Sequence, residues 1–157
     1  MYEWADKNKT TPKTSAPSIE TAMNVMRPYI DEGREIICFS ISSEMSTSIN
    51  VIRMAAEELD AVDKVTVIDS RNLSTGIGLL VVEAAVMAAD GKSREEIKAG
   101  IDELIPKVRA SFVVDTLVYL YRGGRCNAVS ALIGGALALH PMICLLYTSP
   151  SPRDPKT

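Results

Sequence analysis

Apolar and polar positions along the chain alternate in blocks that predict helices and strands in turn. Residues 18–32 place apolar side chains at the spacing of one helical face, and Gly33 ends that helix. A near-continuous apolar run at residues 35–41 is typical of a parallel strand that is covered on both faces. Helical spacing returns at residues 45–59, and residues 65–69 form the next predicted strand. The first half of the chain is therefore predicted to be helix, strand, helix, strand.

The second half of the chain continues this order. Residues 75–89 predict a helix, and Ser93 followed by Glu96 forms a capping box that opens another one. A strand is expected at residues 111–114 and a short helix at residues 116–121. Because strands alternate with helices of this length, we expect βαβ units with a parallel sheet, which is an α/β fold. Ligands of such sheets bind beyond the carboxyl ends of the strands.

Composition narrows the function classes. The 157 residues suit one domain or parts of two, and 46% hydrophobic residues are enough for a packed core. A net charge of −3 argues against a general nucleic-acid-binding protein, which needs a basic face. The apolar stretch at residues 128–147 approaches the length of a membrane span, but Gly134, Gly135 and Pro141 interrupt it. We expect a buried helix and a strand there, in a soluble, cytoplasmic protein without a transmembrane segment.

Neither the cysteines nor the histidine predicts a metal site or a cofactor. Cys38, Cys126 and Cys144 lie far apart without a C-x-x-C pair, so we expect reduced thiols. His140 precedes a proline in an apolar segment and is expected to pack rather than act as a base. Without a G-x-S-x-G motif a hydrolase triad has no support, and residues 76–78 lack the rest of a dinucleotide fingerprint. We therefore expect no catalytic residues and no cofactor.

Two segments are rich in hydroxyls, at residues 14–18 and residues 40–48, and each leads into a predicted helix. The free backbone N–H groups at a helix start favour an anion, and serine or threonine adds hydroxyl donors. A simple helix cap, worth about 1 kcal/mol, explains Ser18 and either Ser43 or Ser46. More hydroxyls remain than caps require, which indicates a site for a small anionic head group.

Three arginines are candidates for contacts to an anion or to a partner protein. Arg71 lies in the loop at residues 69–74, where Asp69 is expected to have a structural role rather than bind a metal. Arg122 and Arg125 flank a Gly-Gly turn, and the planar guanidinium recognises carboxylate and phosphate with paired donors. A helix end with surface arginines explains these two residues equally well.

Four segments taken together resemble the DegV family, fatty-acid-binding proteins of bacteria. They are residues 13–18, residues 41–46, residues 67–74 with Gly76 and Gly78, and residues 116–125. Each segment is short, but their order and spacing are specific. The resemblance covers residues 13–143.

The resemblance implies a two-domain α/β protein that buries one long-chain fatty acid between its domains. A three-layer α/β/α first domain is implied at residues 1–109, and the start of a second α/β domain at residues 110–143. Thr14 and Ser46 would hold the fatty acid carboxylate, in lipid transport or fatty acid metabolism. Some family members are the acyl-carrying subunit of a fatty acid kinase and present the carboxylate to a separate ATP-binding subunit. Further candidates for head-group or partner contacts are Ser15, Ser48, Arg71 and Arg125.

The chain departs from the family pattern in three ways. The family's S-G-T is Ser46, Thr47 and Ser48 here, so a side chain replaces a glycine beside the head group. The family's first strand and most of its second domain have no counterpart, so we expect a central fragment that binds fatty acid weakly on its own. Residues 144–154 resemble the translation of a transposase adapter used in sequencing libraries. We therefore expect residues 144–157 to be a tail of non-native origin.

Two alternatives remain open from the residues alone. A phosphosugar-binding domain of an isomerase-type enzyme also uses serine-rich turns between strand and helix, and Glu44 would then be its base. A binding module that docks a partner through Arg71, Arg122 and Arg125 is compatible with a fatty-acid carrier. The dependence of binding on acyl-chain length separates the carrier from the phosphosugar enzyme, because only the carrier prefers long chains.

Overall fold

The chain divides into two compact units. The computed structural model describes residues 2–8, 10–124 and 142–144. One unit, here called the sheet unit, holds residues 16–110. The other, here called the terminal unit, combines residues up to 15 with residues 111–144. The domain assignment made from the sequence, with a boundary after residue 109, stays a prediction.

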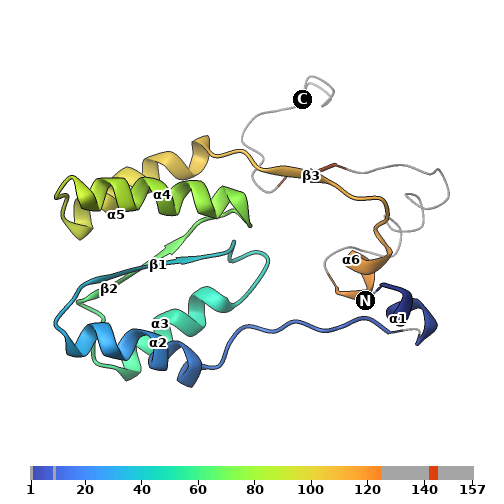
Figure 1. Cartoon of the computed structure of the whole chain (residues 1–157), viewed down its shortest axis with the longest axis horizontal. Helices are drawn as coiled ribbons and strands as arrows, with labels where there is room; N and C mark the ends of the chain where they lie inside the picture. Colours follow the sequence, from blue (N-terminus) through green and yellow to red (C-terminus); the bar gives the residue numbers. More distant parts are fainter. Residues whose placement is uncertain (1, 9, 125–141, 145–157) are drawn as a thin grey trace, which may run out of the picture. The chain divides into compact units, whose positions relative to one another are not determined.

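The sheet unit alternates helices and strands along the chain. Its elements are α2 (Ile19–Asp31), β1 (Ile36–Ser40), α3 (Ser48–Glu58), β2 (Val65–Asp69), α4 (Thr75–Ala89), α5 (Arg94–Leu104) and the 3₁₀ helix η1 (Ile105–Lys107), as Figure 1 shows. β1 and β2 pair in parallel, with Ile36 opposite Val65 and Ser40 opposite Asp69. The predicted α/β fold with parallel strands is confirmed.

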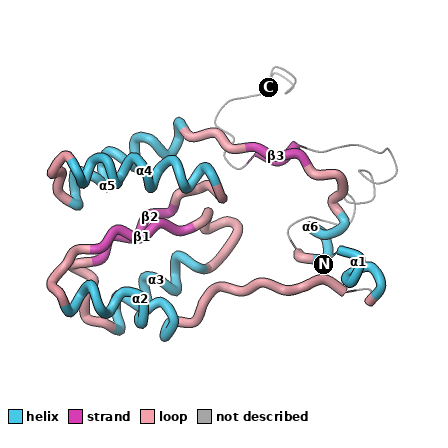
Figure 2. Tube along the Cα trace, in the orientation of Figure 1, coloured by secondary structure: helices cyan, strands magenta, loops and turns pink. Residues whose placement is uncertain are grey.

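Helices cover both faces of this two-stranded sheet, so the sheet unit has three layers (Figures 1 and 2). α4 and α5 pack on one face, where Ile37, Phe39 and Ile68 surround the buried Leu80 and Ile101. α2 and α3 pack on the other face. Successive side chains of a strand point to opposite faces of the sheet, so this face carries a different set of strand residues. That second face carries Ile36, Cys38, Val65 and Val67, which pack with Met26, Ala55 and Ala56.

Local signals in the sequence set two of the helix starts. Ser18 is the N-cap of α2, and its Oγ accepts a hydrogen bond from the Thr21 N–H at 3.1 Å. Ser93 and Glu96 form the predicted capping box of α5, with both reciprocal hydrogen bonds present. These caps satisfy backbone donors that have no partner inside the first helical turn. The two predicted caps are confirmed.

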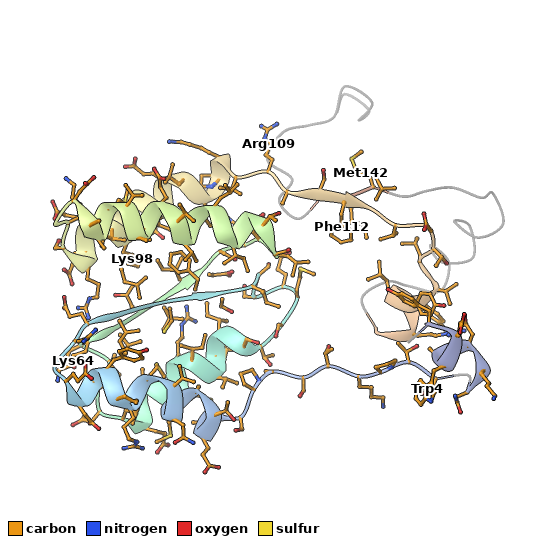
Figure 3. The ribbon with its side chains drawn as sticks, in the orientation of Figure 1. Trp4, Lys64, Lys98, Arg109, Phe112 and Met142 are labelled. Carbon is orange, nitrogen blue, oxygen red and sulfur yellow. The ribbon has the colours of Figure 1, made fainter. Side chains whose placement is uncertain are left out.

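In its described residues, the terminal unit contains two short helices and two short strands. Its elements are α1 (Tyr2–Lys7), β3 (Ser111–Val113), α6 (Val118–Arg122) and β4 (Met142–Cys144). β3 and β4 pair in the antiparallel direction, with Phe112 opposite Ile143. Figure 3 labels Phe112 on β3 and Met142 on β4.

Contacts with α6 hold the polar helix α1. The rings of Tyr2 and Tyr119 have centroids 4.8 Å apart. Asp6 accepts a hydrogen bond from the Tyr119 hydroxyl at 2.8 Å and one from Arg122 Nη1 at 3.1 Å. Ala5 is fully buried. Because so short a helix is marginal by itself, these tertiary contacts explain why the segment is helical.

Several features predicted from the sequence lie outside the described residues, namely Arg125, Cys126, His140 and the helix expected after residue 128. Across the described ranges, no helix has the length and apolar character that crossing a bilayer requires. Cys38 is a free thiol on β1, and its partial burial raises its pKa.

Candidate functional site

Two loops leave the sheet unit at the carboxyl ends of its strands. Residues 41–47 connect β1 to α3, and residues 70–74 connect β2 to α4. Because the strands are parallel and Ser40 lies opposite Asp69, both loops begin at the same edge of the sheet. The alternation of strands and helices predicts ligand chemistry at this edge, which is where α/β sheets bind their ligands.

Buried polar residues join the two loops. Ser40, Ser42, Ser70 and Asn72 are each at most 6% exposed. Ser70 Oγ donates to the Ser40 carbonyl oxygen at 2.6 Å, and the Ser42 N–H donates to the Asn72 carbonyl oxygen at 3.0 Å. Because buried polar groups are costly without hydrogen bonds, these bonds fix one loop against the other. The sequence pattern alone does not single out Ser70 or Asn72 for this role.

Asp69 provides a second connection between the loops. Its Oδ1 accepts hydrogen bonds from the Ser43 N–H at 3.2 Å and from the Arg71 N–H at 3.0 Å. Partial burial raises the pKa of Asp69, but hydrogen bonds from Ser43 and Arg71 outweigh that effect and hold the pKa below its usual value. Asp69 is thus an ionised acceptor that orders both loops. The described part of the chain contains no group of three side chains that could hold a metal ion.

Ser46 and Ser48 come together at the start of α3. Their hydroxyl oxygens are 2.8 Å apart, and Ser46 Oγ accepts a hydrogen bond from the Ser48 N–H at 3.2 Å. Both side chains are half-buried. They form a pair of hydroxyls, here called the serine pair, at a helix N-terminus whose dipole favours an anion.

α3 begins three residues later than the apolar spacing predicts. The Ser46 N–H donates to the Ser42 carbonyl oxygen at 3.2 Å, which makes a turn before the helix starts at Ser48. The N-cap residue is Thr47, whose side chain makes no cap hydrogen bond. The alternative in which Ser43 or Ser46 is a simple helix cap is therefore wrong.

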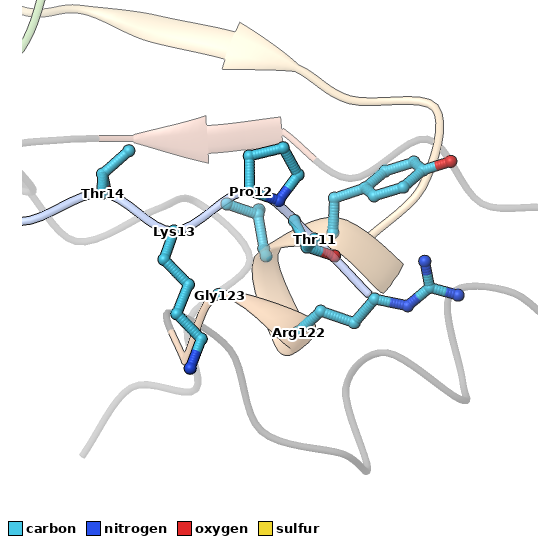
Figure 4. A pocket seen from close by; sticks show the side chains of 8 residues that line it. Thr11, Pro12, Lys13, Thr14, Arg122 and Gly123 are labelled. Atoms are coloured by element: carbon cyan, nitrogen blue, oxygen red, sulfur yellow. The ribbon is translucent and has the colours of Figure 1, made fainter. Parts of the chain in front are cut away.

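Thr14 and Ser15 belong to the terminal unit and are exposed. Within the part of the chain that the structure describes, neither hydroxyl has a hydrogen-bond partner. Thr14 lines a cavity of about 320 Å³ together with Lys13 and Arg122, as Figure 4 shows. The other lining residues are Thr11, Pro12, Tyr119, Leu120 and Gly123. Two cationic side chains beside a hydroxyl suit a carboxylate or a phosphate.

Asp6 orients Arg122 in this cavity. Besides its hydrogen bond to Asp6, the Arg122 guanidinium lies over the Tyr119 ring, 5.5 Å from the centroid. The hydrogen bond from the Tyr119 hydroxyl to Asp6 raises the pKa of Tyr119. The sequence pattern predicts a contact role for Arg122 but not for Lys13 or Asp6. The position of Lys13 next to Thr14 was an available signal, whereas the role of Asp6 depends on the packing of α1 on α6.

The residues predicted to contact a head group are distributed over both units. Ser46, Ser48 and Arg71 lie on the two loops of the sheet unit, whereas Thr14 and Ser15 lie in the terminal unit. Arg125 lies outside the described residues. The Arg71 side chain is exposed, and its backbone has a φ of 50°, which a non-glycine residue rarely adopts.

Comparisons with known proteins match most of the chain. A family model described as "Uncharacterised protein, DegV family" matches residues 1–146. A DegV domain-containing protein of Clostridium acetobutylicum is 39% identical over 140 residues, which cover 86% of this chain and 48% of that protein. The chain thus spans about half the length of the curated relatives it matches.

Two solved structures have the same fold. A structure described as fatty acid binding of a DegV family protein from Thermus thermophilus has a TM-score of 0.75 and 32% identity, and the match covers 86% of this chain and 48% of that one. A stearic acid-binding protein from Eubacterium ventriosum has a TM-score of 0.78 and 31% identity, with coverage of 92% and 50%. Both matches support the α/β fold described above.

Proposed function

We propose, because this chain belongs to the DegV family, that the protein binds a long-chain fatty acid by its carboxylate. The observation that carries the proposal is the serine pair of Ser46 and Ser48, 2.8 Å apart at the start of α3, in a chain similar to two fatty-acid-binding proteins. Hydroxyls at a helix N-terminus are suited to a single negative charge.

The proposed head-group contacts come from both units. Ser46 donates to the carboxylate from the sheet unit and Thr14 donates from the terminal unit, with Ser15, Ser48, Arg71 and Arg125 as further contacts. The chemistry of the Thr14 cavity supports this proposal. Lys13 and Arg122 supply positive charge there, and the buried Thr11 Oγ1, which also lines it, has no hydrogen-bond partner among the described residues.

The proposed protein is a carrier, not an enzyme. Burial of an acyl chain contributes roughly 0.8 kcal/mol for each CH₂ group that leaves water, while a few donors fix the head group. Of the two acidic residues at these loops, Asp69 accepts two backbone hydrogen bonds and is thereby occupied in holding the loops, and Glu44 is exposed. This arrangement supports binding rather than proton transfer.

A finer part of the proposal concerns a partner. A separate ATP-binding kinase subunit would transfer the γ-phosphoryl group of ATP to the bound carboxylate and form an acyl phosphate. The cavity lined by Lys13 and Arg122 supports this step, because both cations suit a phosphoryl group as well as a carboxylate. Since ATP is the second substrate, the proposed location is the cytoplasm.

Native mass spectrometry tests the proposal, on a protein of the length of its relatives and in parallel on the 157-residue chain. A co-purified mass of a C16 or C18 acid is expected, and it should be lost when Thr14 and Ser46 are both changed to alanine. Ser111→Ala is the matched control, because Ser111 is an exposed residue of β3 outside the loops and the cavity. An empty protein that does not take up added palmitate would overturn the proposal, and uptake of a sugar phosphate instead would favour the isomerase-type alternative.

A further inference from the structure

Ser70 and Asn72 are both 0% exposed, and Asn72 is hydrogen-bonded to the loop that carries the serine pair. We propose that these two residues position the Ser46 hydroxyl, and that Gly76 is required because it leaves space for the Asn72 side chain. Neither buried side chain reaches the surface, so their effect on a ligand is indirect. The effect on fatty acid binding rests on the function proposed above, whereas the connection between the loops does not.

Two hydrogen bonds in series connect Asn72 to Ser46. The Asn72 carbonyl oxygen accepts the Ser42 N–H at 3.0 Å, and the Ser42 carbonyl oxygen accepts the Ser46 N–H at 3.2 Å. Ser46 Oγ in turn accepts the Ser48 N–H. A shift of the Asn72 backbone therefore moves the backbone that carries the serine pair.

Ser70 connects Asn72 to the end of β1. Its Oγ accepts the Asn72 N–H at 3.2 Å and donates to the Ser40 carbonyl oxygen at 2.6 Å, and its own carbonyl oxygen accepts Asn72 Nδ2 at 3.3 Å. One buried hydroxyl thus links the end of β1 to the loop after β2. Its loss would leave the buried Asn72 N–H without this partner, whereas the Ser40 carbonyl oxygen would keep the Ser70 N–H, which donates to it at 3.2 Å.

Gly76 lies on the other side of Asn72. A Cβ atom at Gly76 would be 2.5 Å from Asn72 Oδ1, closer than real Cβ contacts come, whereas a Cβ at Gly78 would have no atom of the described residues within 4 Å. Asn72 Oδ1 is buried without a hydrogen-bond partner among the described residues, so contact alone confines it on that side. Packing therefore requires glycine at position 76 but not at position 78, although both belong to the incomplete dinucleotide fingerprint.

The preference of the protein for a charged carboxylate distinguishes a role of these residues in positioning Ser46 from a role in stability alone. A protein of the length of its relatives is titrated with palmitate and with methyl palmitate, which lacks the negative charge. Ser70→Ala and Gly76→Ala are expected to lower palmitate affinity about tenfold, the value of one hydrogen bond to a charged group, and to leave methyl palmitate affinity within about twofold. Gly78→Ala is the matched control and should change neither affinity, and Ser70→Thr, which keeps the hydroxyl, should restore the palmitate affinity.

If Ser70→Ala and Gly76→Ala lower the affinity for both ligands equally, or lower neither, the preference for palmitate over methyl palmitate is unchanged. Either result would overturn the inference. If the unsubstituted protein binds neither ligand, the proposed function fails. Amide hydrogen exchange in the 157-residue chain then decides the inference. Faster exchange of the Ser42 and Ser46 amides in Ser70→Ala, with the β2 amides unchanged, would support it, and unchanged exchange at Ser42 and Ser46 would overturn it.

Discussion

The side-chain amide of Asn72 packs against Gly76 at the start of α4, in the space that a side chain at position 76 would occupy. The two residues are four positions apart, and Ser74 between them has a φ of 52°, which turns the chain into the helix. The helix backbone can therefore approach the loop that carries Asn72. The approach has a direct consequence for stability.

Alanine at the two glycines of α4 is expected to have opposite effects. Gly76→Ala should lower the free energy of unfolding by about 1–3 kcal/mol, because the new methyl group overpacks a buried site. Gly78→Ala should raise it by up to about 1 kcal/mol, because alanine has the higher helix propensity and its Cβ meets no neighbour. Urea unfolding of both variants measures the difference.

The Gly76 effect should depend on Asn72. In a double-mutant cycle, Asn72→Ala removes the side chain that the new methyl group would strike, so Gly76→Ala should cost less in that background. Additive effects of the two substitutions would show that the close approach at Gly76 is not what limits this position.

Asp69→Asn should remove an acid-sensitive part of the stability. The folded pKa of Asp69 is lowered, so its stabilising effect is complete above the unfolded pKa of about 3.9 and is lost as pH falls through the folded value. At pH 7 the substitution should cost about 1 kcal/mol, because a neutral acceptor replaces a charged one. Unfolding free energies of both proteins, measured between pH 3 and pH 7, should begin to approach each other below about pH 4. A constant difference over this range would contradict the assignment.

Two N-cap residues should differ in what they contribute. Ser18→Ala should cost about 1 kcal/mol, because the Ser18 hydroxyl accepts the Thr21 N–H at the start of α2. Thr47→Ala at the start of α3 should cost less than about 0.5 kcal/mol, because the Thr47 side chain makes no cap hydrogen bond. Thermal unfolding of both variants checks the contrast, and equal losses would refute it.

Asp6→Asn should lower the pKa of Tyr119 toward its ordinary value. The carboxylate of Asp6 accepts the Tyr119 hydroxyl and so favours the protonated phenol. The associated stability is present below the unfolded pKa of about 10 and is lost as pH rises through the raised folded value. Absorbance of tyrosinate, titrated with Tyr119→Phe subtracted as the reference, gives the shift. An unchanged titration would mean that Asp6 does not hold the phenol.

Local interactions were predictable from the sequence. The bounds of β2 (Val65–Asp69) and α4 (Thr75–Ala89) agree with the prediction, because each follows a clear apolar pattern. Ser93 and Glu96 are three residues apart, so their reciprocal bonds depend on one turn of backbone. Such elements need little information beyond their own residues.

The connections between the loops were not predictable to the same degree. Parallel strands implied that both loops leave one edge of the sheet, but the bond from the Ser43 N–H to Asp69 spans 26 positions and depends on the strand register. The contact of Gly76 with Asn72 depends on the backbone at Ser74. Packing on α6 decides that α1 is helical, and the residues of α1 alone do not.

The hydrogen bond from Ser70 to the Ser40 carbonyl oxygen closes a chain segment of 30 positions. Closing such a loop costs entropy before any contact compensates for it, whereas the caps of the helices form within a single turn. The serine pair should therefore acquire its geometry late in folding, after β1 and β2 have paired. A synthetic peptide of residues 36–58 would contain every hydroxyl of the loop and still lack the arrangement that holds them.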